Sequence, residues 1–459
     1  MKHEYIPAKD NALTKLQSND LQERVVTLHK LYNRFFRMSP ACIATAPGRV
    51  NLIGEHVDYP DCQWQKDPPA HLYSLGFAID RFFLAGIAPV KEKIIDIIHL
   101  ETGGRLSLSI AELTDLEQTA AKEREAGANP EKRTIPAWAN HTLAVICNVW
   151  KKIKFNSGMA LMLSSTIPFG SGMSNSAANC IAVTTVLKYI FPGLLHNAPI
   201  DIVRFARDAE NSSFVGGCCG WLDQLLIQFS RKNRFSMIDY ADNNITRIKN
   251  NLPPESKIVT VNTNVPHTLS ESDYSTRVRE LALLYNLLSR LTNRHITATA
   301  FSMAQLNELI NIFAPREQAA DLNLITKIYR YTGTVCREYK NFADLKVLLT
   351  QFIKKEYQLP SLSNHKSLSK HQSFAVLLKR MRHQKQSSLL VPAAAASVSK
   401  GDSPFLNELL NTEGSSLRMS GDFAITGTNM AQDTLLDIGL DKANRLGLST
   451  AGRMLGGGG

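Results

Sequence analysis

Residues Ile167–Asn179 read IPFGSGMSNSAAN, and they connect an expected strand, GMALMLSST, to an alanine-rich run with helical spacing at Ser174–Ile190. Gly170 and Gly172 have no Cβ, so the backbone of this segment can approach an anion closely. Side-chain donors follow at Ser174, Asn175 and Ser176, with Ser174 placed to cap the helix. The helix would direct its free N–H groups and the positive end of its dipole at the loop. The segment therefore predicts a phosphate-binding loop, although it has no P-loop lysine; a simple capped turn is the alternative.

A second chemically dense stretch, TAPGRVNLIGEHVDY, occupies residues 45–59. Its polar side chains are Arg49, Asn51, Glu55, His56 and Asp58. Arg49 is embedded among apolar residues, where an unpaired charge is costly, so we expect it to have an acidic partner or a phosphate. Glu55, His56 and Asp58 form a compact array of acceptors and one switchable donor, which suits the hydroxyls of a polyol. A metal site is the weaker alternative, because one histidine and two acids are a thin ligand set.

Composition and charge place the chain among folded proteins. It has 459 residues, 44% hydrophobic and 20% charged, which argues against disorder, a coiled coil or a collagen-like repeat and suits two domains or one large one. The seven cysteines are scattered and never spaced as CxxC, which favours a reducing cytosol over a disulfide framework or a zinc site. The vicinal pair Cys218 and Cys219 is interpreted as buried thiols, with a redox switch as the alternative. No secretory signal and no apolar run of membrane-spanning length is visible in the sequence.

Hydrophobic spacing predicts the order of elements along the chain. Helices are expected near 14–37, 138–153, 199–212 and 221–229, strands at 234–240 and 257–265, and mostly helices after Ser272. Asp, Asn and Pro cluster at 240–256 and mark a domain boundary there. Residues 359–400 carry seven basic side chains and no acid, which we interpret as a mobile basic insertion or linker, with one short helix at SFAVLLKRMRH. The formal net charge of the whole chain is +11, and without that segment 45 basic residues face 41 acidic ones. The charge of the rest of the chain is therefore nearly balanced and does not call for a nucleic-acid partner.

The two motifs together resemble the GHMP kinase superfamily, and residues 45–59 resemble the galactokinase signature at nearly every position. Five further segments are similar to galactokinase motifs and occur in the same order: Trp138-Ala139-Asn140, Glu210–Gln224 with its CGxxDQ pattern, Asn262–Glu280, GDFAITG and the final AGRMLGGGG. The resemblance covers most of the chain. It implies an α+β GHMP kinase fold with two domains, a ribosomal protein S5 domain 2-like N-terminal domain at 1–245 and a ferredoxin-like C-terminal domain at 246–459.

The resemblance also implies roles for individual residues. Asp223 would take or orient the proton of a sugar's anomeric hydroxyl, and Arg49 beside it would keep that carboxylate ionised and stabilise charge on the phosphoryl group. ATP would lie over the loop of Gly170, Ser171, Gly172, Ser174, Asn175 and Ser176, with Trp138 beside the adenine. Mg²⁺ would contact Ser176 and Glu210. The sugar pocket would be formed by Glu55, His56, Asp58, Gly220 and Tyr274.

The sequence departs from the galactokinase pattern in several places. Residues 61–74, DCQWQKDPPAHLYS, are an insertion next to the sugar motif, His141 replaces a stacking tyrosine, and the phosphate loop has MSNSAA instead of LSSSAA. The third motif ordinarily continues as GGGFGGC into a strand and a helix, whereas the sequence stops at Gly459, so we expect a truncated C-terminal domain.

The resulting prediction is a cytoplasmic enzyme that phosphorylates the anomeric hydroxyl of a hexose with MgATP, with galactose as the substrate and galactose 1-phosphate as the product. One alternative is a galactokinase-like sensor or paralogue that binds sugar or ATP with weak turnover. Another is a kinase for a different hexose, such as N-acetylgalactosamine. A nucleic-acid or acidic partner for residues 359–400 is a third, disfavoured because Phe374 is the only aromatic residue there. No membrane partner is expected.

Overall fold

The computed structural model describes residues 2–5, 18–58, 71–126, 135–212, 214–217, 219–261, 273–294, 296–315, 319–336, 338–354, 370–418 and 429–453. The chain forms two compact units, and each consists of two segments of sequence. Unit 1 contains residues 1–50 and 78–230, and unit 2 contains residues 51–77 and 231–459. This division differs from the predicted boundary at 245/246, because residues 51–77 belong to the same unit as the C-terminal half of the chain.

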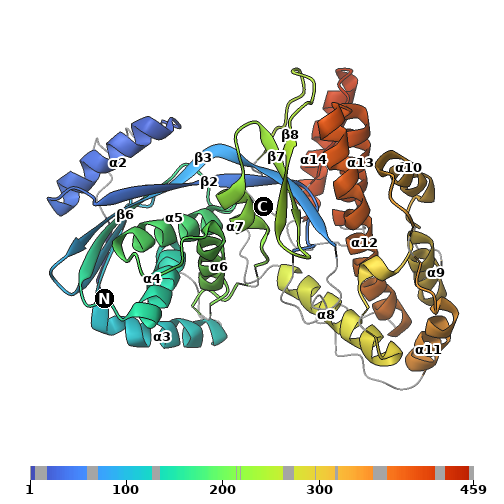
Figure 1. The fold of residues 1–459 in the computed structure, drawn as a ribbon, viewed down its shortest axis with the longest axis horizontal. Helices are drawn as coiled ribbons and strands as arrows, with labels where there is room; N and C mark the ends of the chain where they lie inside the picture. Colours follow the sequence, from blue (N-terminus) through green and yellow to red (C-terminus); the bar gives the residue numbers. More distant parts are fainter. Residues whose placement is uncertain are drawn as a thin grey trace. The chain divides into compact units, whose positions relative to one another are not determined.

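Unit 1 is an α+β unit built on a sheet with the strand order β1-β5-β4-β6-β3 (Figure 1). Its strands are β1 (Lys2–Tyr5), most of β2 (Cys42–Ile53), the second part of β3 (Tyr73–Val90), β4 (Ile94–His99), β5 (Gly104–Ser109) and β6 (Gly158–Ser165). Its helices are α2 (Leu21–Phe36), α3 (Leu113–Glu125), α4 (Asn140–Ile153), α5 (Asn175–Ile190), α6 (Pro199–Glu210) and α7 (Leu222–Phe229), with short 3-10 turns at η3 (Ile110–Glu112) and η5 (Ala137–Ala139). β4 and β6 run parallel, and β6 runs antiparallel to β3 from Gly158 opposite Val90 to Ser165 opposite Phe83.

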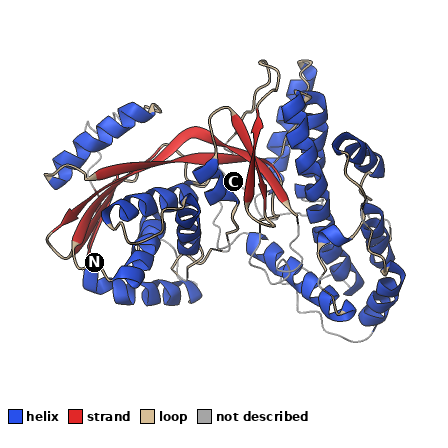
Figure 2. Ribbon diagram, viewed as in Figure 1, coloured by secondary structure: helices blue, strands red, loops and turns tan. Residues whose placement is uncertain are grey.

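Helices cover both faces of this sheet, as Figure 2 shows. On one face α2 packs Leu28, Leu31 and Tyr32 against sheet residues that include Leu84 and Met162. On the other face lie α4, α5 and α6 (Figure 1). Every residue of β6 is buried, which is expected for a strand covered on both sides. The end of β6 is therefore held firmly at the point where the predicted phosphate loop begins.

Unit 2 combines a small antiparallel sheet with a set of helices. The start of β3 pairs with β7 (Arg234–Asp239), and β7 pairs with β8 (Asn244–Lys249). The helices are α8 (Asp273–Thr292), α9 (Met303–Phe313), α10 (Leu322–Thr332), α11 (Phe342–Lys354), α12 (Lys370–Lys400), α13 (Ser403–Leu417) and α14 (Asn429–Arg445), with a 3-10 turn η6 (Ala298–Ala300). The strand predicted at 257–265 is not formed over 257–261, and residues 262–265 lie outside the described part of the chain.

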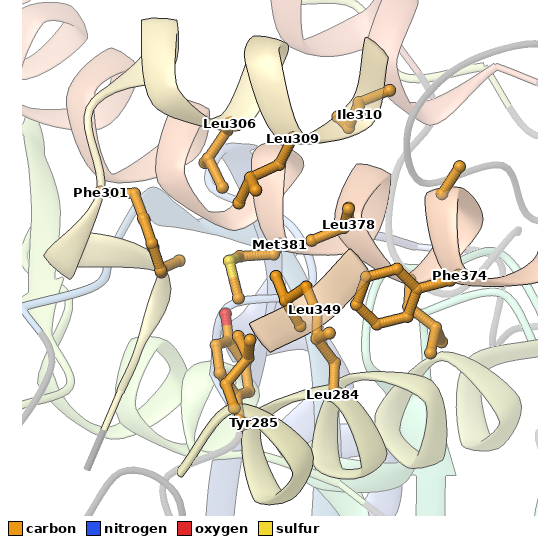
Figure 3. Packing of buried hydrophobic residues seen from close by; sticks show 14 of the residues in the cluster. Leu284, Tyr285, Phe301, Leu306, Leu309, Ile310, Leu349, Phe374, Leu378 and Met381 are labelled. Atoms are coloured by element: carbon orange, nitrogen blue, oxygen red, sulfur yellow. The ribbon is translucent and has the colours of Figure 1, made fainter. Parts of the chain in front are cut away.

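Helix α12 is the centre of unit 2, and the interpretation of residues 359–400 as a mobile basic linker is wrong for Lys370–Lys400. The helix is 31 residues long and packs against α8, α9, α10, α13, β7 and β8. Its first half contributes Phe374, Leu378 and Met381 to one buried cluster, drawn in Figure 3, and its second half joins a second cluster. The polar run RMRHQKQSS between these halves concealed the apolar spacing in the sequence.

The basic side chains in the middle of α12 point into the protein. Arg380, Arg382 and Lys385 are 3–5% exposed. Arg380 Nε donates to Glu280 Oε2 at 3.0 Å, and Glu280 also binds Arg277 through two 2.8 Å hydrogen bonds. These charges are buried, so Arg380, Arg382 and Lys385 do not form a surface for nucleic acid. None of the helices in the described ranges has the length and apolar character needed to cross a membrane.

Candidate functional site

The phosphate loop of unit 1 has the backbone conformation that its sequence predicts. Gly170 and Gly172 have φ angles of +64° and +71°, which glycine adopts without steric cost. A Cβ on Gly170 would meet no atom within 4 Å, so the backbone there faces open space. Helix α5 follows at once, with Ser174 at the N-cap position (φ +62°). The loop therefore presents accessible backbone at the N-terminus of a buried helix, which is the arrangement that favours an anion.

The side chains of the loop act differently from the prediction. Ser174 makes no capping hydrogen bond to α5. The Nδ2 atom of Asn175 donates to Ser165 Oγ and to Ile167 O, both at 2.7 Å, and Ser171 Oγ donates to Pro168 O at 2.8 Å. Asn175 and Ser171 thus use their side chains to hold the shape of the loop, in place of the donor role to phosphate that we expected of Asn175.

Arg49 has the acidic partner that its apolar surroundings require. Its Nε and Nη2 atoms both lie 2.7 Å from Asp223 Oδ1, and its Nη1 donates to Gly172 O at 2.5 Å. Ser174 Oγ donates to the other oxygen, Asp223 Oδ2, at 2.5 Å. Asp223 lies in the first turn of α7, where the helix dipole favours a carboxylate. Arg49 is 5% exposed, whereas the Asp223 side chain is 28% exposed, so the carboxylate is both fixed and accessible.

Glu210 and Ser176 meet beside this pair. Gln224 Nε2 donates to Glu210 Oε2 at 2.6 Å, and the Ser176 hydroxyl also binds the Glu210 carboxylate. Burial raises the pKa of Glu210 to about 7, and the negative charge of Asp223 adds to the rise. The structure brings together Ser176 and Glu210, the two residues expected to contact Mg²⁺. In the part of the chain that the structure describes, no group of three or more histidine, cysteine or acidic side chains could hold a metal.

The loop before α7 folds back on the end of α6. Gly220 is buried, and its carbonyl accepts from Arg207 Nε at 3.2 Å. Asn211 makes two hydrogen bonds with the backbone of Cys219, at 2.6 and 2.9 Å. These contacts position α7, and with it Asp223, next to Glu210. Gly220 was expected to contact sugar; its carbonyl is used to anchor this loop.

An aromatic cluster surrounds Trp138, the residue expected to lie beside adenine. The Trp138 ring is 5.9 Å from His99, and His99 is 5.5 Å from Phe169 in the phosphate loop. Gly104 permits this packing, since a Cβ there would lie 2.5 Å from the indole. Burial lowers the pKa of His141 to about 4, so its imidazole is neutral at pH 7. The sequence did not single out His99 or Phe169, although Phe169 stands within the quoted loop and is 53% exposed.

In unit 2, residues 51–58 of the motif expected to bind sugar (the sugar motif, residues 45–59) contain a buried turn. Glu55, His56 and Asp58 are 2–7% exposed. Glu55 Oε1 accepts from Arg453 Nη2 at 3.0 Å. Burial lowers the pKa of His56 well below its usual value, and the charges of neighbouring arginines lower it further, so the ring is neutral.

The sequence reasoning missed Glu413 and Arg453, which contact this turn. Arg453 Nε donates to Glu413 Oε2 at 3.0 Å, and Glu413 is fully buried. A signal for Glu413 existed, because it falls at helical spacing between the buried Leu409 and Leu417, and a charge on an apolar face needs a partner.

Several predicted features lie outside the described residues. They are residues 61–70 of the insertion, most of the Asn262–Glu280 motif, GDFAITG at 421–427, and the final MLGGGG at 454–459. Tyr274 lies in the first turn of α8, and its side chain is also outside the described part.

Known proteins match the chain in these same motifs. A family model described as the galactokinase galactose-binding signature matches residues 30–63, and the GHMP kinases N-terminal domain matches residues 140–231. A galactokinase of Chloroflexus aurantiacus is 30% identical over 254 residues, which is 55% of this chain and 56% of the relative. The chain thus contains a galactokinase signature and a GHMP kinase N-terminal domain, and it is similar to galactokinases over these regions. A galactokinase of Haemophilus influenzae strain PittGG is 31% identical over 250 residues, 54% of this chain and 56% of the relative.

The aligned regions thus span little more than half the length of these relatives. The crystal structure of Lactococcus lactis galactokinase complexed with galactose shares the fold, with a TM-score of 0.59 and 20% identity over 95% of this chain and 87% of that one. This likeness confirms the predicted α+β GHMP kinase fold.

Proposed function

We propose that the chain transfers the γ-phosphoryl group of ATP to the anomeric hydroxyl of galactose. The observation that carries the proposal is the Arg49–Asp223 pair, placed beside the phosphate loop in a chain that contains the galactose-binding signature. A carboxylate that is held by a buried arginine and is still 28% exposed suits a group that accepts or orients a hydroxyl proton. A protein that only binds sugar would gain nothing from such a carboxylate.

Each residue of the pair has a defined task in this proposal. Asp223 accepts the proton of the anomeric hydroxyl, or orients that hydroxyl towards the phosphoryl group. Arg49 holds the Asp223 carboxylate in place, because its Nε and Nη2 atoms both contact Oδ1. Its planar fork also offers donors to the phosphoryl oxygens as charge develops on them. Ser174 fixes the second oxygen of Asp223, so the carboxylate keeps one orientation.

The nucleotide is proposed to bind over the loop 170–176 with Trp138 next to the adenine. Ser176 and Glu210 would hold Mg²⁺. Their oxygens are the ligand type that Mg²⁺ prefers, and Mg²⁺ keeps several waters, so two protein ligands suffice. The raised pKa of Glu210 supports this fit, since a nearby cation offsets the cost of a buried carboxylate. When bound, Mg²⁺ would neutralise charge on the phosphates.

The galactose hydroxyls are proposed to bind at Glu55, His56 and Asp58, with Tyr274 as a further contact. A cytoplasmic location is proposed too. It is supported by the five described cysteines, which are all free thiols, and by the need for ATP.

The test is ADP release measured with a panel of hexoses, including N-acetylgalactosamine, for the full chain and for Asp223→Asn. We expect galactose to be the preferred substrate and the variant to lose phosphoryl transfer while it retains sugar binding measured by calorimetry. Asp80→Asn is the control, because the Asp80 side chain is 92% exposed and its change should leave turnover intact. Turnover of Asp223→Asn close to that of the unchanged chain would refute the assignment, and binding of galactose without turnover by the unchanged chain would indicate a sensor.

A further inference from the structure

The sugar motif turns sharply at Gly54–His56, and this turn is strained. Gly54 has φ +94° and His56 has φ +59°. A Cβ on Gly54 would lie 2.4 Å from Tyr73 O, so only glycine fits there. His56 has a side chain and still adopts the left-handed conformation, which costs about 1 kcal/mol or more. Such a conformation persists only where the surroundings fix it.

Side chains from three other segments supply the hydrogen bonds that fix the turn. Glu413 Oε1 of α13 accepts from Gly54 N at 2.7 Å and from Glu55 N at 3.3 Å. The α12 side chains bind the carbonyls on the other side of the turn. His383 Nε2 lies 3.1 Å from Glu55 O, and Gln384 Nε2 donates to His56 O at 3.2 Å.

The remaining carbonyl of the turn is held by β3 and by the motif itself. Ser74 Oγ donates to Gly54 O at 2.6 Å, and Asn51 Nδ2 donates to the same oxygen at 3.2 Å. The turn thus has side-chain partners on both its N–H and its C=O groups.

The side chains that hold the turn are themselves fixed. Tyr285 Oη donates to Gln384 Oε1 at 2.8 Å, which sets the orientation of the amide so that its NH₂ faces His56 O. Ser387 Oγ donates to Glu413 Oε1 at 3.2 Å, and Arg453 binds the other oxygen. Because these groups are buried, their hydrogen bonds are exposed to little competition from water.

His383 is fixed in the same way. Its Nδ1 lies 2.8 Å from Ser416 Oγ, and because a carbonyl can only accept, Nε2 donates to Glu55 O.

From this network we propose that Glu413 and Gln384 are positioning residues for sugar binding: they set the backbone of the Gly54–His56 turn and so aim Glu55 and His56 at the substrate. This inference rests on the proposed function for the identity of the sugar. Neither residue needs to touch substrate. Arg453 connects the residue that holds the turn to a side chain of the turn, since it binds Glu413 and also pairs with the Glu55 carboxylate.

The experiment uses the full chain and the variants Gln384→Met and Glu413→Gln. The matched control is Gln386→Met, the same chemical change two residues further along α12, at a side chain for which the described ranges contain no hydrogen bond to the turn. Steady-state kinetics give KM for galactose, KM for ATP and kcat. Hydrogen exchange measured by mass spectrometry gives the protection of the Gly54 and Glu55 amides, a readout that does not depend on sugar.

We expect Gln384→Met to raise KM for galactose about fivefold, the loss of one neutral hydrogen bond. Glu413→Gln should raise KM for galactose about 10-fold or more, because a charge-assisted hydrogen bond is lost. It should also speed hydrogen exchange at the Gly54 and Glu55 amides. KM for ATP should stay within about twofold in both variants, and the control should match the unchanged chain.

Two outcomes overturn the inference. One is unchanged protection of the two amides in Glu413→Gln together with an unchanged KM for galactose in Gln384→Met. The other is a rise in KM for ATP equal to the rise for galactose, because that indicates general destabilisation. If the unchanged chain does not bind galactose at all, the proposed function fails, and exchange at Gly54 and Glu55 still decides whether Glu413 holds the turn.

Discussion

The buried carboxyl of Glu210 makes the stability of unit 1 depend on pH. Glu210 is 1% exposed, and burial raises its pKa from 4.5 to about 7. Between these two values the folded chain holds a proton that the unfolded chain has released. Raising the pH through this range therefore favours unfolding, and the stability present at low pH is lost as pH approaches and passes the folded pKa.

The size of the effect follows from the pKa values. A rise from 4.5 to about 7 corresponds to about 3 kcal/mol, since each unit of pKa equals about 1.4 kcal/mol. The variant Glu210→Gln has no proton to lose, and its amide oxygen can still accept from Gln224. We expect the unchanged chain to lose about 3 kcal/mol more stability than the variant between about pH 4 and about pH 8.

The assay is urea unfolding followed by tryptophan fluorescence at several pH values. Three of the four tryptophans, Trp138, Trp150 and Trp221, belong to unit 1, so the signal reports mainly on the unit that contains Glu210. Glu92→Gln serves as the control, because Glu92 is exposed and its change should leave the pH dependence of stability unaltered. Parallel stability curves for the unchanged chain and Glu210→Gln over this range would refute the reasoning.

Three further predictions concern the Arg49–Asp223 pair and helix α12. Arg49→Lys keeps the charge but loses the planar fork, so kcat should fall about 100-fold in the ADP-release assay, whereas the control Arg81→Lys should be active. Phe374→Ala should lower the free energy of unfolding by about 3–5 kcal/mol, measured by urea unfolding followed by circular dichroism, because the fully buried ring packs edge-on against Phe313 at 4.9 Å. The control Val347→Ala, at a 55% exposed position, should lower it little. An equal loss for both variants would contradict the buried placement of α12. Pro392 lies inside α12, where a proline removes a helix hydrogen bond. Pro392→Ala should therefore raise the free energy of unfolding by about 1–3 kcal/mol in the same assay. A loss of stability would contradict this prediction and show that the packing of the proline ring outweighs the backbone cost.

Local patterns in the sequence were enough to predict much of unit 1. The apolar run GMALMLSST and the alanine-rich run after it became β6 and α5, and the glycines between them adopt positive φ angles. These features depend on neighbouring residues and on backbone sterics, which a sequence displays directly. The same short-range reasoning failed for α12, because its polar centre has the composition of a solvated linker and is buried only by the helices that surround it.

The sequence by itself determined which residues needed partners. An arginine among apolar residues requires an acidic partner or a phosphate. The family resemblance placed Arg49 beside Asp223, 174 positions away, whereas only the tertiary structure decided that Glu413 on α13, 359 positions from Gly54, holds the turn. The physical reason is that the cost of burying a charge or a strained turn is set locally, whereas the group that offsets the cost is chosen by the packing of segments far apart along the chain.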